Sequence, residues 1–355
     1  MADKLLTTPR ELGYRWPAEW ELQAGVWVSW PRNPQTWPGH FEAVPAEFAQ
    51  FVRLLAEYET VHVLAGGREV MEQARALVGA VRNVVLHDIA TNDAWCRDHG
   101  PTFLSSHQAG LPAALVDWEY NAWGGKYPPF DLDNEVPQRI AARQGRRVFS
   151  PGIVLEGGAI EGNGRGCVLT TESCLLNANR NAGMTKERAE GYLRDYLGAE
   201  KVLWLSGGEI VGDDTDGHID QIARFVNETT VVVSACDDPG DDNYEPAQQN
   251  LRELAALSDQ DGRPLSIVPL ALPGPVYCDE QRLPASYANF LIANGVVAVP
   301  AFGDAADAVA VATLAPLFPG RDVRLCPSRN LAWGLGSFHC LSQQEPVAHL
   351  PKAAS

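Results

Sequence analysis

The chain has 355 residues, of which 45% are hydrophobic, and a formal net charge of −17. This size allows one large hydrophobic core or two smaller ones. The negative charge argues against nucleic acid and anionic membranes as partners and favours a small cationic ligand. Residues 1–13 contain no apolar run typical of a signal peptide, and no stretch approaches the roughly 20 apolar residues of a membrane span. We therefore expect a cytoplasmic protein.

The seven cysteines are odd in number and include no Cys-x-x-Cys pair. Such usage is typical of free thiols in a reducing compartment rather than of a disulfide framework. The same spacing argues against a structural zinc site.

Apolar, β-branched runs alternate with helical patterns along the chain. The runs predict strands at 61–66, 84–89, 114–118, 202–205, 230–235, 266–272 and 296–302. The helical patterns lie at 46–58, 69–80, 186–197, 246–257 and 305–317. This order predicts a mixed α/β fold. Because no linker or charge block divides the chain, we interpret residues 1–355 as a single domain.

Two glycine-rich segments resemble each other. LEGGAIEGN (155–163) and LSGGEIVGD (205–213) match at Leu, Gly-Gly, Ile and Gly, fifty residues apart. A period of this length is typical of repeated supersecondary units, as in a propeller. In each copy an acidic stretch follows the turn and precedes an expected strand, so the loops could converge on a shared centre.

Residues 213–220, DDTDGHID, place four aspartates around one histidine. A calcium loop of the EF-hand type fails here, because Ala223 stands where its Glu would be. Zinc would need more imidazoles or thiolates than His218 alone. Asp220 follows His218 by two residues before an expected strand, so both side chains should share a face as an acid/base and its carboxylate. A polar surface turn is the alternative.

Three other stretches carry candidate reactive groups. Cys340 follows the glycine-rich loop of GLGSFHCLSQQEP (334–346), where a thiol can be exposed. A thiolate there needs a nearby positive charge, and the adjacent His339 would point to the opposite face of an extended chain. Asp98 precedes a Gly-Pro turn, and Glu156 precedes Gly-Gly. A surface pair with Arg97 and a turn acceptor are the respective alternatives.

Taken in order, these stretches resemble the serial motifs of the agmatine deiminase family, which includes the bacterial peptidylarginine deiminases. The motifs are WPAEWELQAGVWVSWP, NDAWCRDHGPTF, LEGGAIEGNGRGCVLTTESCLLNANRN, GDDTDGHID, LPASYANFLIANG and HCLSQQEP. The resemblance covers residues 14–346 and implies a pentein fold, a five-bladed α/β propeller of ββαβ units with a central active site. Departures are Asn163, Cys167 and a short 121–137 segment, which leave the identity of the substrate open.

The resemblance implies the hydrolysis of a guanidinium group in a single catalytic domain, without metal or organic cofactor. Asp98 and Asp220 would clamp the planar cation, since carboxylates match paired N–H donors. Glu156 would assist beside His218. Cys340 would attack the central carbon, and His218 would protonate the departing ammonia and then activate water.

The far end of the substrate is less constrained. Agmatine would bring a second cation, which Asp213 and Asp214 could face while Trp95 or Trp123 packs on the methylene chain. Free arginine would instead need a basic residue for its carboxylate. Agmatine is thus the expected partner. A deiminase for peptidyl arginine, a non-catalytic cation-binding protein and a metal-dependent hydrolase are the alternatives. A homodimer and the roles of Cys96, His99 and Glu161 stay open.

Overall fold

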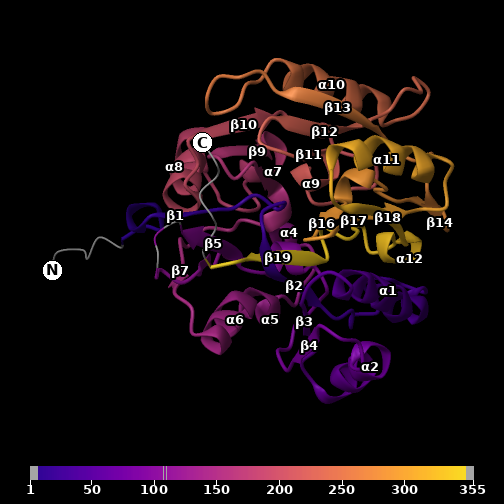
Figure 1. The fold of residues 1–355 in the computed structure, drawn as a ribbon. Helices are drawn as coiled ribbons and strands as arrows, with labels where there is room; N and C mark the ends of the chain where they lie inside the picture. The colour runs from indigo at the N-terminus through magenta and orange to yellow at the C-terminus, as the bar shows by residue number, and fades with distance from the viewer. Residues whose placement is uncertain (1–6, 107, 109, 349–355) are drawn as a thin grey trace.

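The computed structural model describes residues 7–348 except 107 and 109. Within this part of the chain, the strands form five sheets of three or four strands and one separate hairpin (Figure 1). Each of the five sheets combines antiparallel and parallel pairing. None of these described sheets closes on itself.

The first sheet joins the two ends of the chain. Its order is β19-β2-β3-β4, with β2 (Gln23–Ser29), β3 (Val61–Leu64), β4 (Val84–His87) and β19 (Ser342–Pro346). Helices α1 (Val44–Ala56) and α2 (Arg68–Val78) connect its parallel strands. Because β19 pairs antiparallel with β2, the yellow C-terminal strand lies beside the indigo N-terminal one (Figure 1).

The remaining sheets follow one another along the chain. The second contains β1 (Tyr14–Arg15), β5 (Thr102–Ser106), β6 (Ala114–Val116) and β7 (Val148–Phe149), with α5 (Asp131–Asn134) and α6 (Val136–Gln144) before β7. The third contains β8 (Ile160–Gly162), β9 (Cys167–Thr171) and β10 (Lys201–Leu205), with α7 (Glu172–Leu175) and α8 (Lys186–Leu197). The fourth contains β11 (Ala223–Phe225), β12 (Thr230–Ala235) and β13 (Ser266–Ala271), with α10 (Tyr244–Ala255). The fifth contains β16 (Leu291–Ile292), β17 (Val296–Ala301) and β18 (Asp322–Pro327), with α11 (Ala306–Leu314).

Short elements complete the chain. They are the hairpin β14 (Tyr277–Cys278) and β15 (Gln281–Arg282), and the single-turn helices α3 (Cys96–His99), α4 (Ala122–Gly125), α9 (Ile219–Ile222) and α12 (Arg329–Ala332). The predicted α/β class is confirmed, and each of the expected strands and helices has a counterpart. The expected bounds match those of α8 and β12, and the other elements have at least one shifted end.

Helix α1 shows how packing positions a functional segment. Its apolar face buries Phe48, Phe51 and Leu55. The ring of Phe51 stacks on Phe338 with centroids 4.4 Å apart. Burying a side chain of this size contributes about 2–3 kcal/mol. This contact therefore anchors the segment that carries Cys340, two residues further on, to a helix near the N-terminus.

Two local predictions are wrong. In the segment 155–163, Gly-Gly leads into strand β8, whereas 205–213 contains the end of β10 and then no strand before β11. The sequence echo therefore marks glycine turns and not equivalent structural units. Asp220 lies inside α9 rather than directly before a strand, so its relation to His218 does not come from strand alternation.

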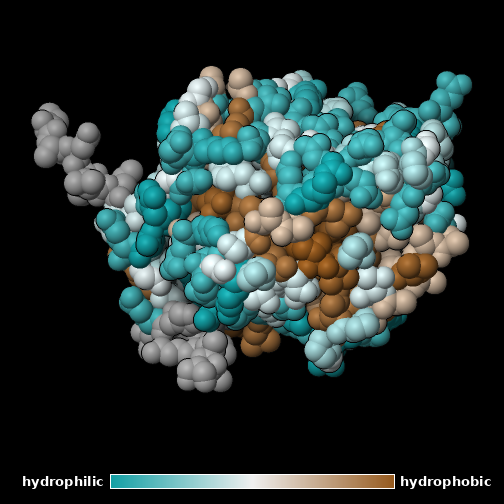
Figure 2. All heavy atoms as spheres, turned by 90° about the horizontal axis from the view of Figure 1, so that it is seen from above, coloured by the Kyte–Doolittle hydropathy of each residue, from teal (hydrophilic) through white to brown (hydrophobic). Residues whose placement is uncertain are grey.

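One face of the molecule has a hydrophobic centre and a mostly hydrophilic periphery (Figure 2). Figure 2 shows hydrophobic residues gathered near the centre of one face and surrounded by hydrophilic ones. Among the described helices, α1 is the longest at 13 residues, and a helix suited to crossing a bilayer is absent from this part of the chain.

Candidate active site

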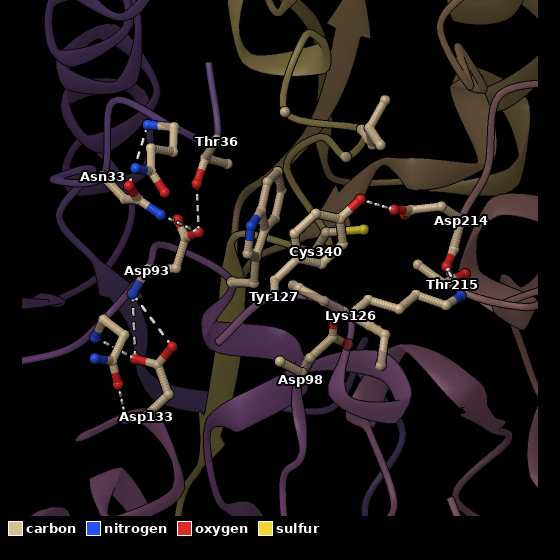
Figure 3. A pocket seen from close by; sticks show the side chains of 18 of the residues that line it. Asn33, Thr36, Asp93, Asp98, Lys126, Tyr127, Asp133, Asp214, Thr215 and Cys340 are labelled. Carbon is tan, nitrogen blue, oxygen red and sulfur yellow. Dashed lines mark hydrogen bonds between the residues drawn. The ribbon is translucent and has the colours of Figure 1, made fainter. Parts of the chain in front are cut away.

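A pocket of about 700 Å³ opens where loops from several sheets meet. Five of the predicted site residues line it, namely Trp95, Asp98, Trp123, Asp214 and Cys340. Figure 3 shows Cys340 between Asp93 and Asp214 in that view of the pocket. The structure thus brings residues from three separate motifs, and Trp123 from the segment 121–137, to one cavity.

Cys340 is held from two sides. Asn289, in the single 3-10 turn Tyr287–Asn289, donates from Nδ2 to the sulfur at 3.1 Å and accepts from the Cys340 N–H at 3.2 Å. The thiol donates to Asp220 Oδ2 at 3.4 Å. Burial raises the pKa of Cys340 well above its usual value, and the negative charges of Asp220 and Asp98 raise it further. The prediction that this thiol is exposed is wrong, because the sulfur is buried. The raised pKa favours the protonated thiol until a cation binds beside it.

Asp98 presents its carboxylate under a strained turn. Trp123 Nε1 donates to Oδ2 at 3.1 Å, and the Gly158 N–H donates to Oδ1 at 3.0 Å. Ala122 and Trp123 adopt left-handed backbone angles, with φ of 50° and 56°. Such strain in a non-glycine residue costs about 1–3 kcal/mol and is common at functional sites. Burial raises the pKa of Asp98, and the neighbouring Asp220 and Glu156 raise it further.

Gly158 explains how His218 and the two aspartates converge. A Cβ added at Gly158 would lie 2.5 Å from His218 Nδ1, 2.8 Å from Asp98 Oδ1 and 3.1 Å from Asp220 Oδ2. Both ring nitrogens of His218 are buried without a hydrogen-bond partner among the described residues. Burial lowers the pKa of His218, although Glu156 and Asp220 oppose this effect. The absence of a side chain at Gly158 therefore leaves room for the His218 ring beside the two carboxylates.

A buried charge network supports Asp220. His339 bridges Asp220 Oδ2 at 2.7 Å and Glu19 Oε2 at 2.9 Å. Arg224 contacts Glu19 and Glu161, each at 2.7 Å. Burial alone would raise the pKa of Asp220, but the hydrogen bond from His339 and the charges of His339, His218 and Arg224 together lower it. Asp220 therefore stays ionised more readily than Asp98.

Glu156 lies behind the pocket rather than in its lining. Arg180 donates from Nε to Glu156 Oε1 at 2.6 Å and from its terminal nitrogens to Asp216 and to the Thr215 carbonyl. Ligand atoms of Glu156, Cys174 and His218 lie within 4.8 Å of one another, a grouping that could hold a metal ion. The Arg180 guanidinium opposes a second cation there. Glu156 thus lies beside His218 and outside the lining of the pocket.

The neighbours Asp213 and Asp214 have different environments. Asp213 accepts from the Thr215 hydroxyl at 2.8 Å and from the Gly217 N–H at 3.0 Å, so it fixes its own loop. This geometry contradicts the prediction that Asp213 faces the substrate. Asp214 lines the pocket and accepts a hydrogen bond from the Tyr127 hydroxyl.

The three residues whose roles the sequence left open, Cys96, His99 and Glu161, are buried and do not line the pocket. Cys96 is fully buried, and burial raises its pKa to about 12. Burial lowers the pKa of His99 to about 3, and its ring lies 3.3 Å from the Ser29 hydroxyl. Glu161 pairs with Arg224.

Sequence reasoning missed four supporting residues. They are Glu19, Arg180, Asn289 and His339, which contact Arg224, Glu156, Cys340 and Asp220 respectively. Each of these residues lies inside one of the motifs quoted above, so its place in a motif was the only sequence feature that could have pointed to it.

The model of the Porphyromonas-type peptidyl-arginine deiminase family matches residues 15–346. The chain belongs to this family. It is 37% identical to the agmatine deiminase of Ectopseudomonas mendocina over 97% of this chain and 98% of that protein. The solved agmatine deiminase of Enterococcus faecalis is 32% identical, covers 97% of this chain and 99% of its own, and superposes with a TM-score of 0.92. The α/β fold is therefore that of the agmatine deiminase structures.

A third relative concerns the nucleophile. A cysteine-to-serine variant of C. jejuni agmatine deiminase, solved with substrate bound, is 30% identical to this chain. It covers 94% of this chain and 96% of its own, with a TM-score of 0.85.

Proposed function

We propose that the protein hydrolyses agmatine to N-carbamoylputrescine and ammonia. The observation that carries this proposal is the position of the Cys340 thiol, which lies 3.4 Å from Asp220 in a pocket also lined by Asp98. Two acidic groups beside one thiol suit a planar cation whose central carbon the sulfur attacks. The 37% identity to an agmatine deiminase supports the same reaction.

The first step is binding of the guanidinium by Asp98 and Asp220. Burial and mutual repulsion favour a protonated Asp98. A bound guanidinium reverses this preference, because an opposite charge within hydrogen-bond distance favours the ionised carboxylate. Substrate binding and carboxylate ionisation therefore support each other.

The second step is formation of the covalent intermediate. The substrate cation stabilises the Cys340 thiolate, and His218 takes the thiol proton. The sulfur then bonds to the central carbon, and one C–N bond breaks as His218 returns that proton to the leaving ammonia. The product of this step is an S-alkylthiouronium intermediate.

The third step is hydrolysis. His218 removes a proton from water, and the oxygen bonds to the same carbon while the C–S bond breaks. The released product carries a ureido group, and the sulfur regains a proton. Glu156, 2.6 Å from Arg180, steadies the positive charge that His218 carries between these transfers. No step of this scheme uses a metal ion.

The amine end is assigned to Asp214, with Trp95 and Trp123 on the methylene chain. The two indoles both line the pocket and meet edge to face, with centroids 6.4 Å apart. Asp214 shares this lining and offers a carboxylate to a cation.

Arginine or peptidyl arginine is the second candidate, because basic groups also line the pocket. Lys126 pairs with Asp216 at 3.0 Å, and Arg32 donates to the Gly66 carbonyl at 3.1 Å. Arg32 could receive the carboxylate that agmatine lacks. Ammonia release measured with agmatine, arginine and an arginyl peptide at equal concentration decides between them. A preference for arginine or the peptide would overturn agmatine as the substrate.

Three broader assignments belong to the same proposal. We infer that the five sheets are the blades of a pentein propeller, each contributing a loop to the central pocket, in one catalytic domain. The seven free cysteines favour a reducing compartment, consistent with a cytoplasmic location. A homodimer stays a prediction that sedimentation analysis would check.

A further inference from the structure

A second group of metal-ligating side chains lies beside the pocket and outside the residues assigned to the reaction. It consists of His40, Cys278 and Asp279, whose ligand atoms lie within 4.8 Å of one another. His40 Nε2 lies 3.3 Å from Cys278 Sγ and 3.6 Å from Asp279 Oδ2. His40 is separated from Cys278 by 238 residues, so the fold brings these ligand types together.

The two separations from His40 Nε2 match those between ligands of a tetrahedral metal ion, and the Cys278 and Asp279 ligand atoms lie within 4.8 Å of each other. Zinc binds sulfur at about 2.3 Å and nitrogen or oxygen at about 2.0–2.2 Å. At tetrahedral angles, such bonds place N and S about 3.5 Å apart, and N and O about 3.4 Å apart. The two measured distances agree with these values to within a few tenths of an ångström. A thiolate, an imidazole and a carboxylate favour Zn²⁺ or a similar ion over Ca²⁺ and Mg²⁺, which prefer oxygen ligands alone.

Both sides of the group are held in place. The His40 ring packs edge-on against Trp333, with centroids 5.2 Å apart, and Trp333 Nε1 donates to the Pro38 carbonyl at 3.0 Å. Cys278 pairs with Gln281 in the β14–β15 hairpin, and Asp279 occupies the turn with a left-handed φ of 52°.

The hairpin is in turn anchored to the protein. Arg282 donates from the single nitrogen Nη2 to both oxygens of Asp241 at 2.7 Å. Both side chains are largely buried, so this ion pair ties the hairpin to the segment that carries Asp241. The ligands are therefore presented by supported segments, and little rearrangement would be needed to bind an ion.

We propose that His40, Cys278 and Asp279 bind Zn²⁺ or a similar divalent ion, with the fourth position open to water. Binding releases the Cys278 proton to solvent, because the metal ligand is the thiolate. The site would join the loop before His40 to the β14–β15 hairpin. Pro38 from the loop and Gln281 from the hairpin both line the pocket, so the ion would fix part of the pocket's rim.

The test is a calorimetric titration of the full-length Cys340→Ser variant with Zn²⁺ alone. The background substitution removes the nucleophilic thiol as a competing ligand. We expect one equivalent of Zn²⁺ per chain. His40→Ala and Cys278→Ser should each weaken binding by at least about 100-fold, because losing a residue that only supports a ligand already costs about 10- to 100-fold. Asp279→Asn, at an exposed turn, should also weaken Zn²⁺ binding.

Cys236→Ser is the matched control. Cys236 and Cys278 are both partly exposed free thiols. Among the described residues, however, the Cys236 sulfur donates to the Asp238 carbonyl at 3.8 Å and is not grouped with a histidine. Its loss should leave Zn²⁺ binding unchanged. Co²⁺ gives a second readout, since a thiolate-to-cobalt absorption band should appear in the parent and vanish in Cys278→Ser.

Three outcomes would overturn the proposal: no stoichiometric binding by the parent, unchanged binding by Cys278→Ser, or equal weakening by Cys236→Ser. Circular dichroism of each variant verifies that the fold is retained. Because the measurement uses the metal alone, its result is independent of whether agmatine is the substrate.

Discussion

The His339 Nδ1 atom lies 2.7 Å from Asp220 Oδ2, the same oxygen that accepts from the Cys340 thiol at 3.4 Å. Two adjacent residues therefore reach one carboxylate. This is possible because residues 338–340 form a turn and not an extended strand. The prediction that His339 points away from the site was wrong for that reason, although it correctly excluded His339 as the direct partner of the sulfur.

Replacing Cys340 by Ser should abolish turnover while retaining agmatine binding. The hydroxyl fills nearly the same volume but is a far weaker nucleophile, so we expect kcat to fall at least about 10⁴-fold. Calorimetry should still detect agmatine, and mass spectrometry should detect a covalent adduct only in the wild type. The partly exposed Cys236→Ser variant should keep full activity. Measurable turnover by Cys340→Ser would refute the covalent route.

Gly158→Ala should inactivate the protein without unfolding it. The new methyl group would stand 2.5 Å from His218 Nδ1 and 2.8 Å from Asp98 Oδ1, so one of them must move. Displacement of a reacting group by about 1 Å costs about 100-fold in rate. Gly191→Ala is the control, because its methyl group would meet only the mobile end of Arg194 at 3.5 Å. Normal kcat in Gly158→Ala would show that His218 and Asp98 need not converge.

Asp213→Asn and Asp214→Asn should separate loop support from substrate binding. We expect Asp214→Asn to raise the KM for agmatine about tenfold, equivalent to roughly 1.4 kcal/mol, with little change in kcat. Asp213→Asn should lower thermal stability instead, because Asp213 accepts from Thr215 and Gly217. Steady-state kinetics and melting curves measure both effects. An unchanged KM in Asp214→Asn would leave the amine end of the substrate unassigned.

Arg224→Ala should destabilise the fold strongly. The fully buried guanidinium contacts Glu19 and Glu161, and its removal takes from Glu161 its paired cation and leaves Glu19 with only Arg97 and His339. Breaking such a buried pair typically costs about 3–5 kcal/mol in the free energy of unfolding. Arg263→Ala, which removes a half-exposed pair with Asp259, should cost less than about 1 kcal/mol. Urea denaturation of the two variants compares these costs, and equal costs would contradict the role assigned to the network.

Glu59→Gln should reduce the pH dependence of stability. Burial raises the pKa of Glu59 from its ordinary value of 4.5 to about 7, so the folded state holds this proton more tightly than the unfolded chain. The associated stability is fully present below pH 4.5 and is lost as pH rises to about 7, a difference of roughly 3 kcal/mol. The variant should therefore gain stability relative to the wild type above pH 7. Parallel stability curves from pH 4 to 8 would contradict this.

The sequence predicted the helices, the strands and the residues gathered around the pocket better than it predicted the contacts that support those residues. Strands such as 230–235 follow from β-branched runs, and Cys340, His218 and Asp98 follow from motifs. The hydrogen bond from Asn289 to Cys340 joins residues 51 positions apart, and the bond from His339 to Glu19 joins residues 320 positions apart. No local pattern reports such contacts, because they depend on how separate sheets pack.

The sequence also could not distinguish the position of Asp213 from that of Asp214. Its sequence neighbour Asp214 lines the pocket, yet the carboxylate of Asp213 turns back to Thr215 and Gly217. Two adjacent aspartates are equivalent in composition and charge. Only the backbone direction of the loop separates a group that can meet substrate from one that holds the turn.

The pairing of β19 with β2 has a consequence for synthesis of the protein. Position 340, where we place the nucleophile, lies two residues before the last described strand, whose partner β2 was translated more than 300 codons earlier. A nascent chain on the ribosome therefore holds most of the carboxylate clamp long before it holds the sulfur. A chain truncated before this strand would lack both the sulfur at position 340 and the strand that covers the outer edge of β2 in the first sheet.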